Sequence, residues 1–501
     1  DGAHASGGAS MSARLSNSSS IAAGVAIPGY DRMRPSGIVH IGVGAFHKAH
    51  QAVYTDDALA RSGGDWMITG VSLRSADVAE ALNPQDGLYT LLVRGPQGVS
   101  ARVVGAIARV LVAPRDPAAV LEALAAPSTR IVSLTITEKG YGLDPATGGL
   151  DRAHPAVAAD LADPVHPQGA VGFIVEALRL RRERGLGGFT VLCCDNLPGN
   201  GRVVGRLVGE FARERDAELA RFIEAEVSFP STMVDRITPA STERTSADVL
   251  ALTGCEDRAA VETEPFSQWI VEDRFVAGRP HWEAGGALFV DDVAPYEKMK
   301  LRLLNGSHSL LAYSGFLAGH AYVRDVMADA DLVALIERHM REAARTLAPV
   351  PGVDLDAYAQ DLRQRFANPA IAHQTYQIAM DGTQKLPQRL LEPAAEALAK
   401  GLPLDSYAFA VAAWMRYALG RNESGEAYAL RDPREAEIAA LVDRDTNPAE
   451  IARRLLALPG LFPSALSGSL PFADAVTHRL GLMLSEGMRT AIRREAEQCR
   501  A

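Results

Sequence analysis

The chain has 501 residues, of which 47% are hydrophobic and 22% are charged. This balance is typical of a globular protein and excludes a disordered chain, and the length exceeds what one hydrophobic core usually organises, so we expect two large domains. The formal net charge of -10 is spread along the chain with acidic and basic residues mixed, which argues against nucleic acid as a partner.

No segment reads as a membrane anchor or as a secretion signal. No apolar run reaches the roughly 18 residues that span a bilayer, and the first residues lack a charged start followed by an apolar centre. Four cysteines, of which Cys193 and Cys194 are adjacent, offer neither a disulfide framework nor the spacing of a zinc site. We therefore expect a cytoplasmic protein that binds no membrane and no metal.

The N-terminal residues read as an appendage. Residues 1–10 precede Met11 and resemble an expression scar, and the serine-rich stretch that ends at Ser20 is typical of a loose end. We predict that residues 1–20 are a tag and a disordered tail.

The folded chain opens with an alternation of strands and helices. A β-branched run at Ile38–Ile41 is followed by Gly42 and Gly44 and then by a helical pattern, which is how a nucleotide-binding βαβ unit begins. Further strands are expected at Met67–Val71, Arg130–Thr135 and Thr190–Cys194, and helices at Pro117–Ala125 and Gly169–Arg184. This alternation predicts a parallel, doubly wound sheet of the Rossmann type.

After Pro295 the pattern becomes helical. Long amphipathic segments are expected as helices at Glu297–Ser314, Leu332–Thr346, Leu355–Phe366, Pro403–Leu419 and Asp474–Ala496. We predict a Rossmann-type α/β domain over residues 21–294 and a mostly α-helical C-terminal substrate domain over residues 295–501. The active site is expected in the cleft between these domains.

The sequence GVGAFH predicts the cofactor site. Gly42 permits a tight turn, and Gly44 lets backbone N–H groups approach a pyrophosphate, although His47 stands where the third glycine of the fingerprint is usual. Asp77 follows the second strand, where an acid can hold ribose hydroxyls and repel a 2′-phosphate, so we expect NAD rather than NADP. The alternatives are a glycine turn without a ligand and a helix cap at Asp77. The candidate cofactor contacts are Gly42, Gly44, Ala45, Phe46, Arg74, Asp77 and Glu138.

The segment PYEKMKLRLLNGSHSLLAYSG predicts the catalytic residues. At about 100° per residue, Glu297, Lys300, Asn305 and His308 fall within one arc of less than half the circumference. A lysine whose pKa is lowered by desolvation can take the proton of an alcohol while a hydride leaves its carbon. Asparagines such as Asn305 and Asn196 can stabilise the developing alkoxide, which predicts metal-free oxidation of a secondary alcohol. The alternative is an exposed helix face with an incidental histidine.

Seven segments together resemble the long-chain polyol dehydrogenase family, also called the mannitol dehydrogenase family. They span about Gly37 to Leu391 and read GIVHIGVGAFHKAHQAVYTDDAL, SLTITEKGY, CDNLPGNG, FPSTMVDRITP, EPFSQWIVEDRF, YEKMKLRLLNGSHS and NPAIAHQTYQIAMDGTQKLPQRL. The resemblance implies a Rossmann-type first domain, a mostly helical second domain, NAD and no zinc.

The resemblance also implies a role for each catalytic candidate. Lys300 would be the general acid/base, with Asn196 and Asn305 as the oxyanion-type contacts. His308 would bind a substrate hydroxyl, and Glu297 would pass the proton to solvent.

Two branches of the family differ in substrate. TEKGY, KLRLLNGSHS and QIAMDGTQKLPQR resemble fructuronate reductases, which interconvert D-fructuronate and D-mannonate. Asp235 would bind substrate hydroxyls, or would pair with Arg236. A substrate carboxylate requires a cation, for which Lys139, Arg302 and Lys385 are candidates, with structural salt bridges as the alternative for each.

Two glutamines leave the substrate open. Gln374 stands where fructuronate reductases commonly have an arginine, and Gln377 stands where mannitol 2-dehydrogenases have one, so an uncharged hexitol or pentitol is the alternative substrate. A nucleotide-binding sensor without turnover is a third hypothesis, but a sensor has no use for a base such as Lys300. The expected partner is a small sugar acid or polyol, and the expected state is a monomer or a weak homo-oligomer.

Overall fold

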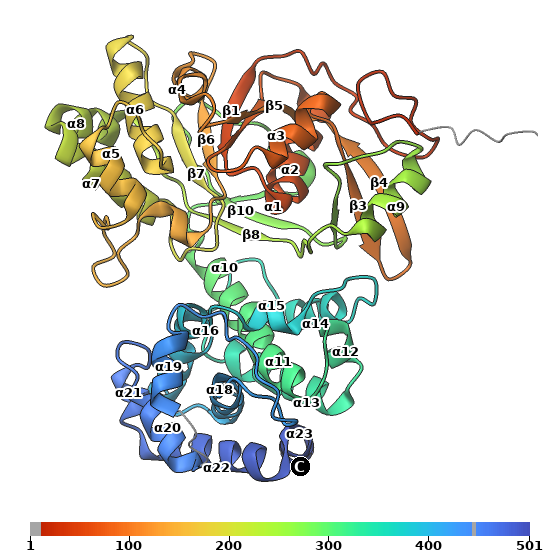
Figure 1. Ribbon diagram of the computed structural model, residues 1–501, viewed down its shortest axis with the longest axis vertical. Helices are drawn as coiled ribbons and strands as arrows, with labels where there is room; N and C mark the ends of the chain where they lie inside the picture. Colours follow the sequence, from red (N-terminus) through yellow and green to blue (C-terminus); the bar gives the residue numbers. More distant parts are fainter. Residues whose placement is uncertain (1–11, 443–446) are drawn as a thin grey trace, which may run out of the picture. The chain divides into compact units, whose positions relative to one another are not determined.

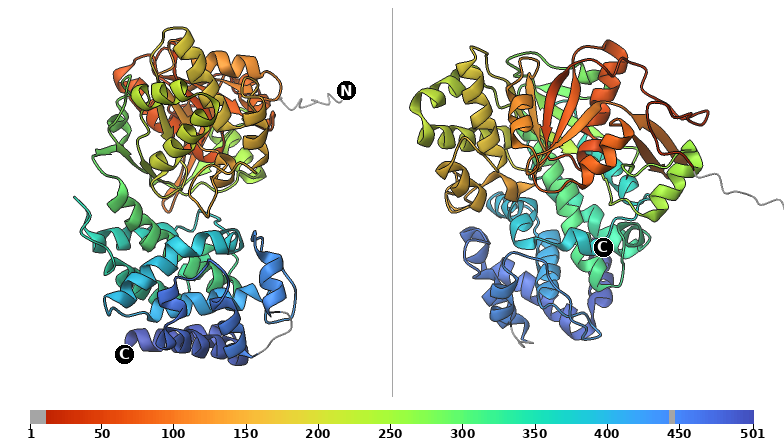
Figure 2. Two further views of the ribbon diagram at one scale, coloured as in Figure 1. Left: turned by 90° about the vertical axis from the view of Figure 1, so that its left-hand side faces the viewer. Right: turned by 45° about the horizontal axis from the view of Figure 1, so that its top comes forward.

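The computed structural model describes residues 12–442 and 447–501. The chain divides into two compact units, with the division between Val293 and Ala294 (Figure 1). The first unit combines a parallel sheet with helices, whereas the second is built from helices (Figure 2). This architecture confirms the predicted fold class.

A five-stranded parallel sheet forms the centre of the first unit, in the order β5-β2-β1-β6-β7. The strands are β1 (Ser36–Ile41), β2 (Met67–Ser72), β5 (Ile107–Val112), β6 (Ile131–Leu134) and β7 (Thr190–Cys193). All four predicted strands are therefore confirmed. The strand order reverses between β1 and β6, and ligands of such sheets bind beyond the carboxyl ends of the strands at this reversal.

Both faces of this sheet are buried, because successive side chains of a strand point to opposite faces. On β1, Val39 and Ile41 belong to one hydrophobic cluster, and Ile38 belongs to another. The first cluster is completed by α4 (Pro117–Ala125), α5 (Pro155–Ala162), α6 (Ala170–Glu183), α7 (Asn200–Arg215) and α8 (Ala217–Glu226). The second is completed by α1 (Ala45–Ala49), α2 (Gln51–Ser62) and α3 (Asp77–Leu82).

Two small sheets that the sequence did not predict complete the first unit. One has the order β11-β10-β8, and the other has the order β4-β3-β9. Their strands are β3 (Tyr89–Gly95), β4 (Gly98–Val104), β8 (Thr232–Asp235), β9 (Val261–Thr263), β10 (Gln268–Glu272) and β11 (Leu288–Val290), and α9 (Glu243–Thr253) lies between β8 and β9 in the chain. Four of these strands, β8 to β11, have only three to five residues, which leaves too little alternation in the sequence to be recognised.

The predicted disordered tail is wrong for the part that the structure describes. Leu15 is 1% exposed and packs in a small cluster with Cys255. Its backbone N–H donates a hydrogen bond to the carbonyl of Glu256 over 2.8 Å. A serine-rich composition therefore concealed one buried leucine, while residues 1–11, with the predicted expression scar, lie outside the described residues.

One buried helix organises the second unit. This helix, α11 (Gly306–Leu317), contacts α13 (Ala330–Ala344), α15 (Thr375–Ala379) and α18 (Asp405–Ala418). Every residue from 306 to 315 is buried. The surrounding helices are α10 (Ala294–Met299), α12 (Val323–Met327), α14 (Leu355–Phe366), α16 (Gly382–Leu386), α17 (Glu392–Ala399), α19 (Glu435–Val442), α20 (Pro448–Leu456), α21 (Ser464–Ser467), α22 (Leu470–Glu486) and α23 (Met488–Arg500).

Two helices predicted as continuous are interrupted. The predicted helix at 297–314 is α10, then a π-helical segment, η4 (Lys300–Asn305), and then α11. The predicted helix at 474–496 breaks at Gly487, whose φ of 86° ends α22. The periodicity of apolar residues locates long helices, but it does not reveal a short π-helical segment or a single glycine with positive φ that ends a helix.

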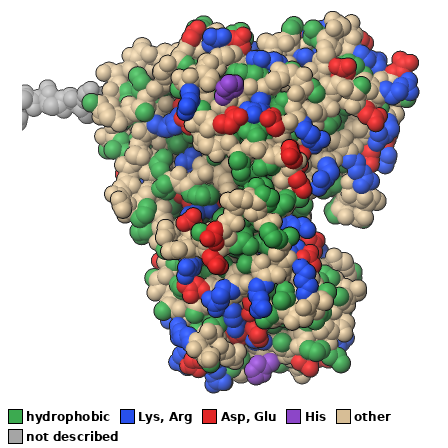
Figure 3. Space-filling model, turned by 180° about the vertical axis from the view of Figure 1, so that it is seen from behind, with side chains coloured by type: hydrophobic (Ala, Val, Ile, Leu, Met, Phe, Trp, Pro, Cys, Tyr) green, Lys and Arg blue, Asp and Glu red, His purple; other side chains and the backbone are tan. Residues whose placement is uncertain are grey.

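Among the described residues, no helix combines the length and the apolar character that crossing a bilayer requires. On the face of the molecule shown in Figure 3, basic and acidic side chains are interspersed on both units. This distribution agrees with the mixed charges of the sequence.

We predict that Leu15→Ala lowers the free energy of unfolding by about 2–4 kcal/mol, because it empties a fully buried leucine site. Ile27→Ala is the matched control, since Ile27 is 61% exposed and its truncation should change stability by less than about 0.5 kcal/mol. Denaturant unfolding of the two variants measures the difference. Equal stability of both variants would contradict the packing of the N-terminal segment.

Candidate active site

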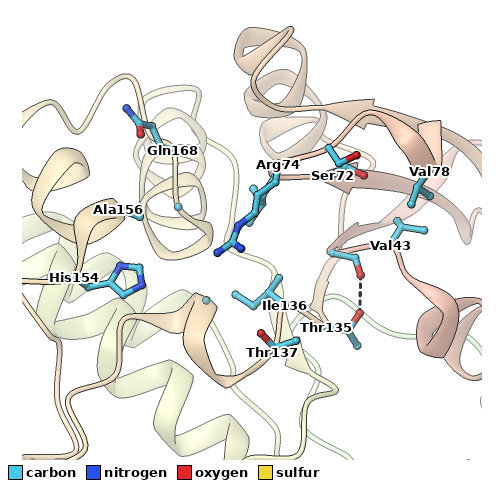
Figure 4. A pocket seen from close by; sticks show the side chains of 15 residues that line it. Val43, Ser72, Arg74, Val78, Thr135, Ile136, Thr137, His154, Ala156 and Gln168 are labelled. Atoms are coloured by element: carbon cyan, nitrogen blue, oxygen red, sulfur yellow. Dashed lines mark hydrogen bonds between the residues drawn. The ribbon is translucent and has the colours of Figure 1, made fainter. Parts of the chain in front are cut away.

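A cavity of about 390 Å³ lies at the carboxyl ends of β1, β2 and β6 (Figure 4). A second cavity of about 400 Å³ shares Leu73 and Gln168 with the first and is lined by apolar residues that include Pro114, Pro117 and Phe173. The shared residues make the two cavities neighbours, and apolar surface predominates in both. Two adjoining cavities of this kind suit an elongated ligand with a flat apolar end.

The first cavity begins at Gly42, where only glycine fits. Its φ is 93°, and a Cβ would lie 2.1 Å from the carbonyl oxygen of Thr135. The Gly42 N–H donates to the Val71 carbonyl over 2.8 Å, and the Thr135 hydroxyl donates to the Gly42 carbonyl over 2.8 Å. Gly42 therefore joins the ends of β1, β2 and β6.

Gly44 has a different reason to be glycine. Its φ of -140° is open to any residue, and a Cβ would meet nothing closer than the Gly42 carbonyl at 4.0 Å. The packing of the protein therefore leaves room beside this backbone, as the approach of a pyrophosphate would require. Ala45 and Phe46 follow in α1, half-buried against the core.

His47, which stands at the position of the third glycine of the fingerprint, is buried in the core. It is 1% exposed and stacks on His40 with the ring centroids 3.4 Å apart. His40 contacts the hydroxyls of Ser133 and Thr135 over 2.7 and 2.8 Å. Since Thr135 gives its proton to Gly42, His40 must donate through Nε2. Burial lowers the pKa of His40 to about 3, so the ring is neutral at pH 7.

The acid predicted to hold the ribose does not line the cavity. Asp77 is the exposed first residue of α3, and its backbone N–H donates to the Ser75 hydroxyl over 3.1 Å; since α3 has no side-chain cap hydrogen bond, the Asp77 carboxylate does not cap the helix either. Arg74 lines the cavity instead and points into it (Figure 4). Glu138 and Lys139 are exposed in the short turn η2 (Glu138–Tyr141).

Asp195 fixes the part of the cavity wall that Ile136 and Thr137 form. The sequence analysis did not single it out. Its carboxylate accepts hydrogen bonds from the backbone N–H groups of Ile136 and Thr137 over 2.9 and 3.3 Å, and from the Tyr141 hydroxyl over 2.6 Å. These bonds hold Thr137 at φ 66° and ψ 159°, a conformation that costs a non-glycine residue about 1–3 kcal/mol. Burial raises the pKa of the Asp195 carboxyl.

Asn200 aligns the ends of β7, which precedes Asn196, and β8, which carries Asp235. Its side-chain NH₂ donates to the carbonyls of Cys193 and Thr232 over 2.9 and 3.1 Å, and its oxygen accepts from the Thr232 N–H over 2.9 Å. Asn196 is exposed just beyond β7, and Asp235 is the buried last residue of β8. The buried amide therefore fixes the ends of both strands.

In the second unit, the catalytic candidates flank the π-helical segment. Lys300 opens η4 and is 7% exposed, Asn305 closes it, and Glu297 lies half-buried in α10. His308, one turn into α11, is 5% exposed. The angles expected for a regular α-helix therefore do not apply. The burial of Lys300 and His308 contradicts the alternative of an exposed helix face.

The His308 imidazole is neutral and available to a ligand. Its Nε2 is buried without a hydrogen-bond partner among the described residues. The ring lies 4.6 Å from the Phe366 ring and 5.3 Å from the His373 ring. Burial holds the pKa of His308 well below its usual 6.5, so the imidazole carries no charge at pH 7.

Basic side chains surround this histidine. After burial, the neighbouring His373, Arg389, Arg365 and Lys300 lower the pKa of His308 further, and His373 is itself neutral at pH 7 because burial lowers its pKa to about 4. Arg389 lies on a second π-helical segment, η5 (Pro387–Leu391), which packs against η4. The sequence did not single out three of these residues, His373, Arg389 and Arg365, because they occupy different elements.

Arg302 is committed to an ion pair. Its guanidinium donates to both carboxylate oxygens of Glu396 over 2.7 and 2.8 Å, and to the Thr346 carbonyl over 3.2 Å. This geometry favours the salt-bridge alternative, so we do not retain Arg302 as a substrate contact. Lys385, in α16, donates to the Ile378 carbonyl over 3.1 Å, and its charge adds to burial, the larger cause, in lowering the pKa of His373.

Among residues 12–442 and 447–501, no group of three or more His, Cys, Asp or Glu side chains is arranged to hold a metal ion.

Comparison with known families and proteins covers nearly the whole chain. Residues 36–284 match the family described as mannitol dehydrogenase Rossmann domain, and residues 292–483 match the mannitol dehydrogenase C-terminal domain. The D-mannonate oxidoreductase of Escherichia coli K12 is 44% identical over 474 residues, which cover 93% of this chain and 97% of that protein. The uncharacterized oxidoreductase YeiQ of the same organism is 47% identical over 460 residues, which cover 90% and 92%.

Among solved structures, this chain is similar to the mannitol 2-dehydrogenase of Pseudomonas fluorescens in its ternary complex with NAD and D-mannitol. The TM-score is 0.89 at 41% sequence identity, and the match covers 97% of this chain and 100% of that one.

We predict that Asp195→Asn lowers the free energy of unfolding by about 2–3 kcal/mol, because an amide oxygen can accept at most two of the three hydrogen bonds and the new NH₂ group then faces a backbone N–H donor. Tyr141→Phe is the matched comparison, since it removes one donor and leaves the carboxylate bound to both backbone groups; it should cost about 1 kcal/mol. Denaturant unfolding tests the order. A smaller loss of stability for Asp195→Asn than for Tyr141→Phe would contradict the stabilising role of the Asp195 hydrogen bonds.

Proposed function

This chain belongs to the mannitol dehydrogenase family of oxidoreductases, and we propose that it interconverts D-mannonate and D-fructuronate with NAD as the hydride carrier. One observation carries the choice of substrate: the neutral, buried His308 is surrounded by basic side chains. A sugar acid supplies both the hydroxyl and the negative charge that such surroundings favour. The 44% identity to D-mannonate oxidoreductase supports the same choice.

The first unit is the proposed NAD site. The residues fit the cofactor, because the bare backbone at Gly44 leaves room for a pyrophosphate and the apolar cavity beside Leu73 suits an adenine ring. When bound, NAD accepts the hydride. Gly42 and Arg74 line the proposed site, whereas Asp77 contributes only the start of α3.

Lys300 is the proposed general base. When D-mannonate is oxidised, its hydroxyl proton moves to the Lys300 amine while the hydride leaves the same carbon, so the products are a ketone and the reduced cofactor. Amide donors at Asn196 and Asn305 stabilise the negative charge that develops on the oxygen. Glu297 then receives the proton from Lys300 and passes it to solvent. His308, neutral at pH 7, orients the substrate through its unpartnered Nε2.

The substrate carboxylate is assigned to the second unit. With Arg302 paired to Glu396, Lys385 and Arg389 are the proposed cations. Arg389 also approaches the Ser309 hydroxyl, at 3.4 Å, directly beside His308 in the chain. Lys139 is a further candidate, and Asp235 is assigned to substrate hydroxyls.

A second candidate substrate is D-mannitol. Gln374, a neutral residue at the start of α15, replaces the arginine that the resemblance led us to expect in a reductase of sugar acids. The similarity to mannitol 2-dehydrogenase at a TM-score of 0.89 favours the same alternative.

We predict that Lys300→Ala lowers kcat by about 100-fold or more, because it removes a positioned acid/base. Lys298→Ala is the control, since Lys298 is an exposed lysine two residues away and its loss should leave kcat within about twofold. Absorbance of the reduced cofactor follows turnover, and fluorescence titration should show NADH binding nearly unchanged in both variants. Normal turnover by Lys300→Ala would remove Lys300 from the mechanism.

The substrate is decided by comparing D-mannonate with D-mannitol at equal concentration and saturating NAD. We expect faster oxidation of D-mannonate, and we expect Arg389→Ala to raise the KM for D-mannonate by at least about tenfold, as for the loss of a charge-assisted contact. The KM for D-mannitol should change little, since mannitol carries no carboxylate. Faster oxidation of D-mannitol would favour the second candidate, and inactivity with both would reject the pair.

A further inference from the structure

We propose that His373 is a specificity-determining residue of the second unit, where its Nδ1–H donates a hydrogen bond to the carboxylate of a bound sugar acid. This inference rests on the proposed function and deepens it, because it adds a neutral donor to the cations assigned to that carboxylate.

Two buried ring nitrogens carry the first step. Neither the His373 Nδ1 nor the His308 Nε2 has a hydrogen-bond partner among the described residues. The two rings meet edge to face, with their centroids 5.3 Å apart. Buried polar atoms in proteins are nearly always hydrogen-bonded. Two such nitrogens in neighbouring rings therefore indicate a polar ligand that binds beside both.

Backbone contacts hold His373 in this position. Its carbonyl accepts the Val323 N–H over 2.9 Å. The Thr375 N–H donates to the Ala321 carbonyl over 3.0 Å, and the Thr375 hydroxyl donates to the His320 carbonyl over 2.8 Å. Thr375 is fully buried, so these hydrogen bonds are shielded from water. A ring anchored in this way is a preorganised donor, which loses little freedom when a ligand binds.

The charges around His373 favour an anion as this ligand. Burial, followed by the charges of Lys385 and Arg389, lowers the pKa of His373 to about 4, so the free protein keeps the ring neutral at pH 7. A neutral imidazole has one N–H donor, and a carboxylate beside Nδ1 selects the tautomer with the proton on that nitrogen. The negative charge of the carboxylate strengthens this hydrogen bond and attracts both cations. A neutral hydroxyl gains less from the same three side chains.

His373 also stands beside the residue that left the substrate open. Gln374 replaces the arginine that the resemblance led us to expect in a reductase of sugar acids, and Gln374 is exposed. The preceding residue, His373, contacts the ring of His308 instead. This segment therefore offers the carboxylate a donor although the arginine is absent.

Calorimetric titration of the full chain, saturated with NADH, measures the Kd for D-mannonate and for D-mannitol without turnover. Two amides separate the ring nitrogens, because asparagine carries its nitrogen as far from Cβ as Nδ1 lies, and glutamine carries it as far as Nε2. We expect His373→Gln to raise the Kd for D-mannonate at least about tenfold, as for the loss of a charge-assisted contact, and His373→Asn to raise it less than about threefold. The Kd for D-mannitol should change less than about threefold in both variants, since mannitol has no carboxylate. His478→Gln, at an exposed histidine of α22, is the control.

Two outcomes would overturn the inference while leaving the proposed function intact. Equal effects of His373→Asn and His373→Gln on the binding of D-mannonate would refute Nδ1 as the donor. Equal weakening of D-mannonate and D-mannitol would give His373 a structural role without specificity for the carboxylate. Failure of the wild-type chain to bind D-mannonate would refute the proposed function as well.

Discussion

The contact between Gly42 and Thr135 is the constraint on which the first unit depends. The backbone at Gly42 passes so close to the Thr135 carbonyl that no side chain fits there. The same backbone joins the ends of β1, β2 and β6 through its hydrogen bonds. This junction lies at the point where the strand order reverses, and the cavity opens beside it, at the carboxyl ends of the strands. His40 supports the junction from below through Thr135, and Asp195 holds the next residues in a conformation that they would not adopt alone.

The second unit uses the same kind of constraint between helices. A Cβ at Gly306 would lie 2.8 Å from the His339 ring and 2.9 Å from the Arg389 carbonyl, so glycine allows η4 and η5 to approach. Both segments are π-helical, and such segments are rare and frequent at functional sites because they re-aim side chains. Here they carry Lys300 and Arg389, the proposed base and one of the proposed cations.

The sequence predicted the parts of the fold that repeat and missed the parts that depend on single contacts. Four strands and the helices α4 and α6 were predicted because buried runs and apolar periodicity extend over many residues. The wide turn at η4, the three-residue strands and the buried leucine of the N-terminal segment have no such pattern. Among the candidate site residues, sequence motifs led to the proposal of Lys300 and Asn305, whereas only the structure revealed that Arg302 pairs with Glu396.

The stacked pair of His40 and His47 limits where this protein can work. Burial lowers the pKa of His40 to about 3 and holds that of His47 well below 6.5, so the folded chain keeps both rings uncharged. The unfolded chain binds protons at these histidines below about pH 6.5, whereas the folded chain does not, so acidification favours unfolding. The histidine stack that supports the glycine turn therefore makes the first unit less stable in acid. The segment that forms the proposed cofactor site thus also determines the pH range in which the fold is stable.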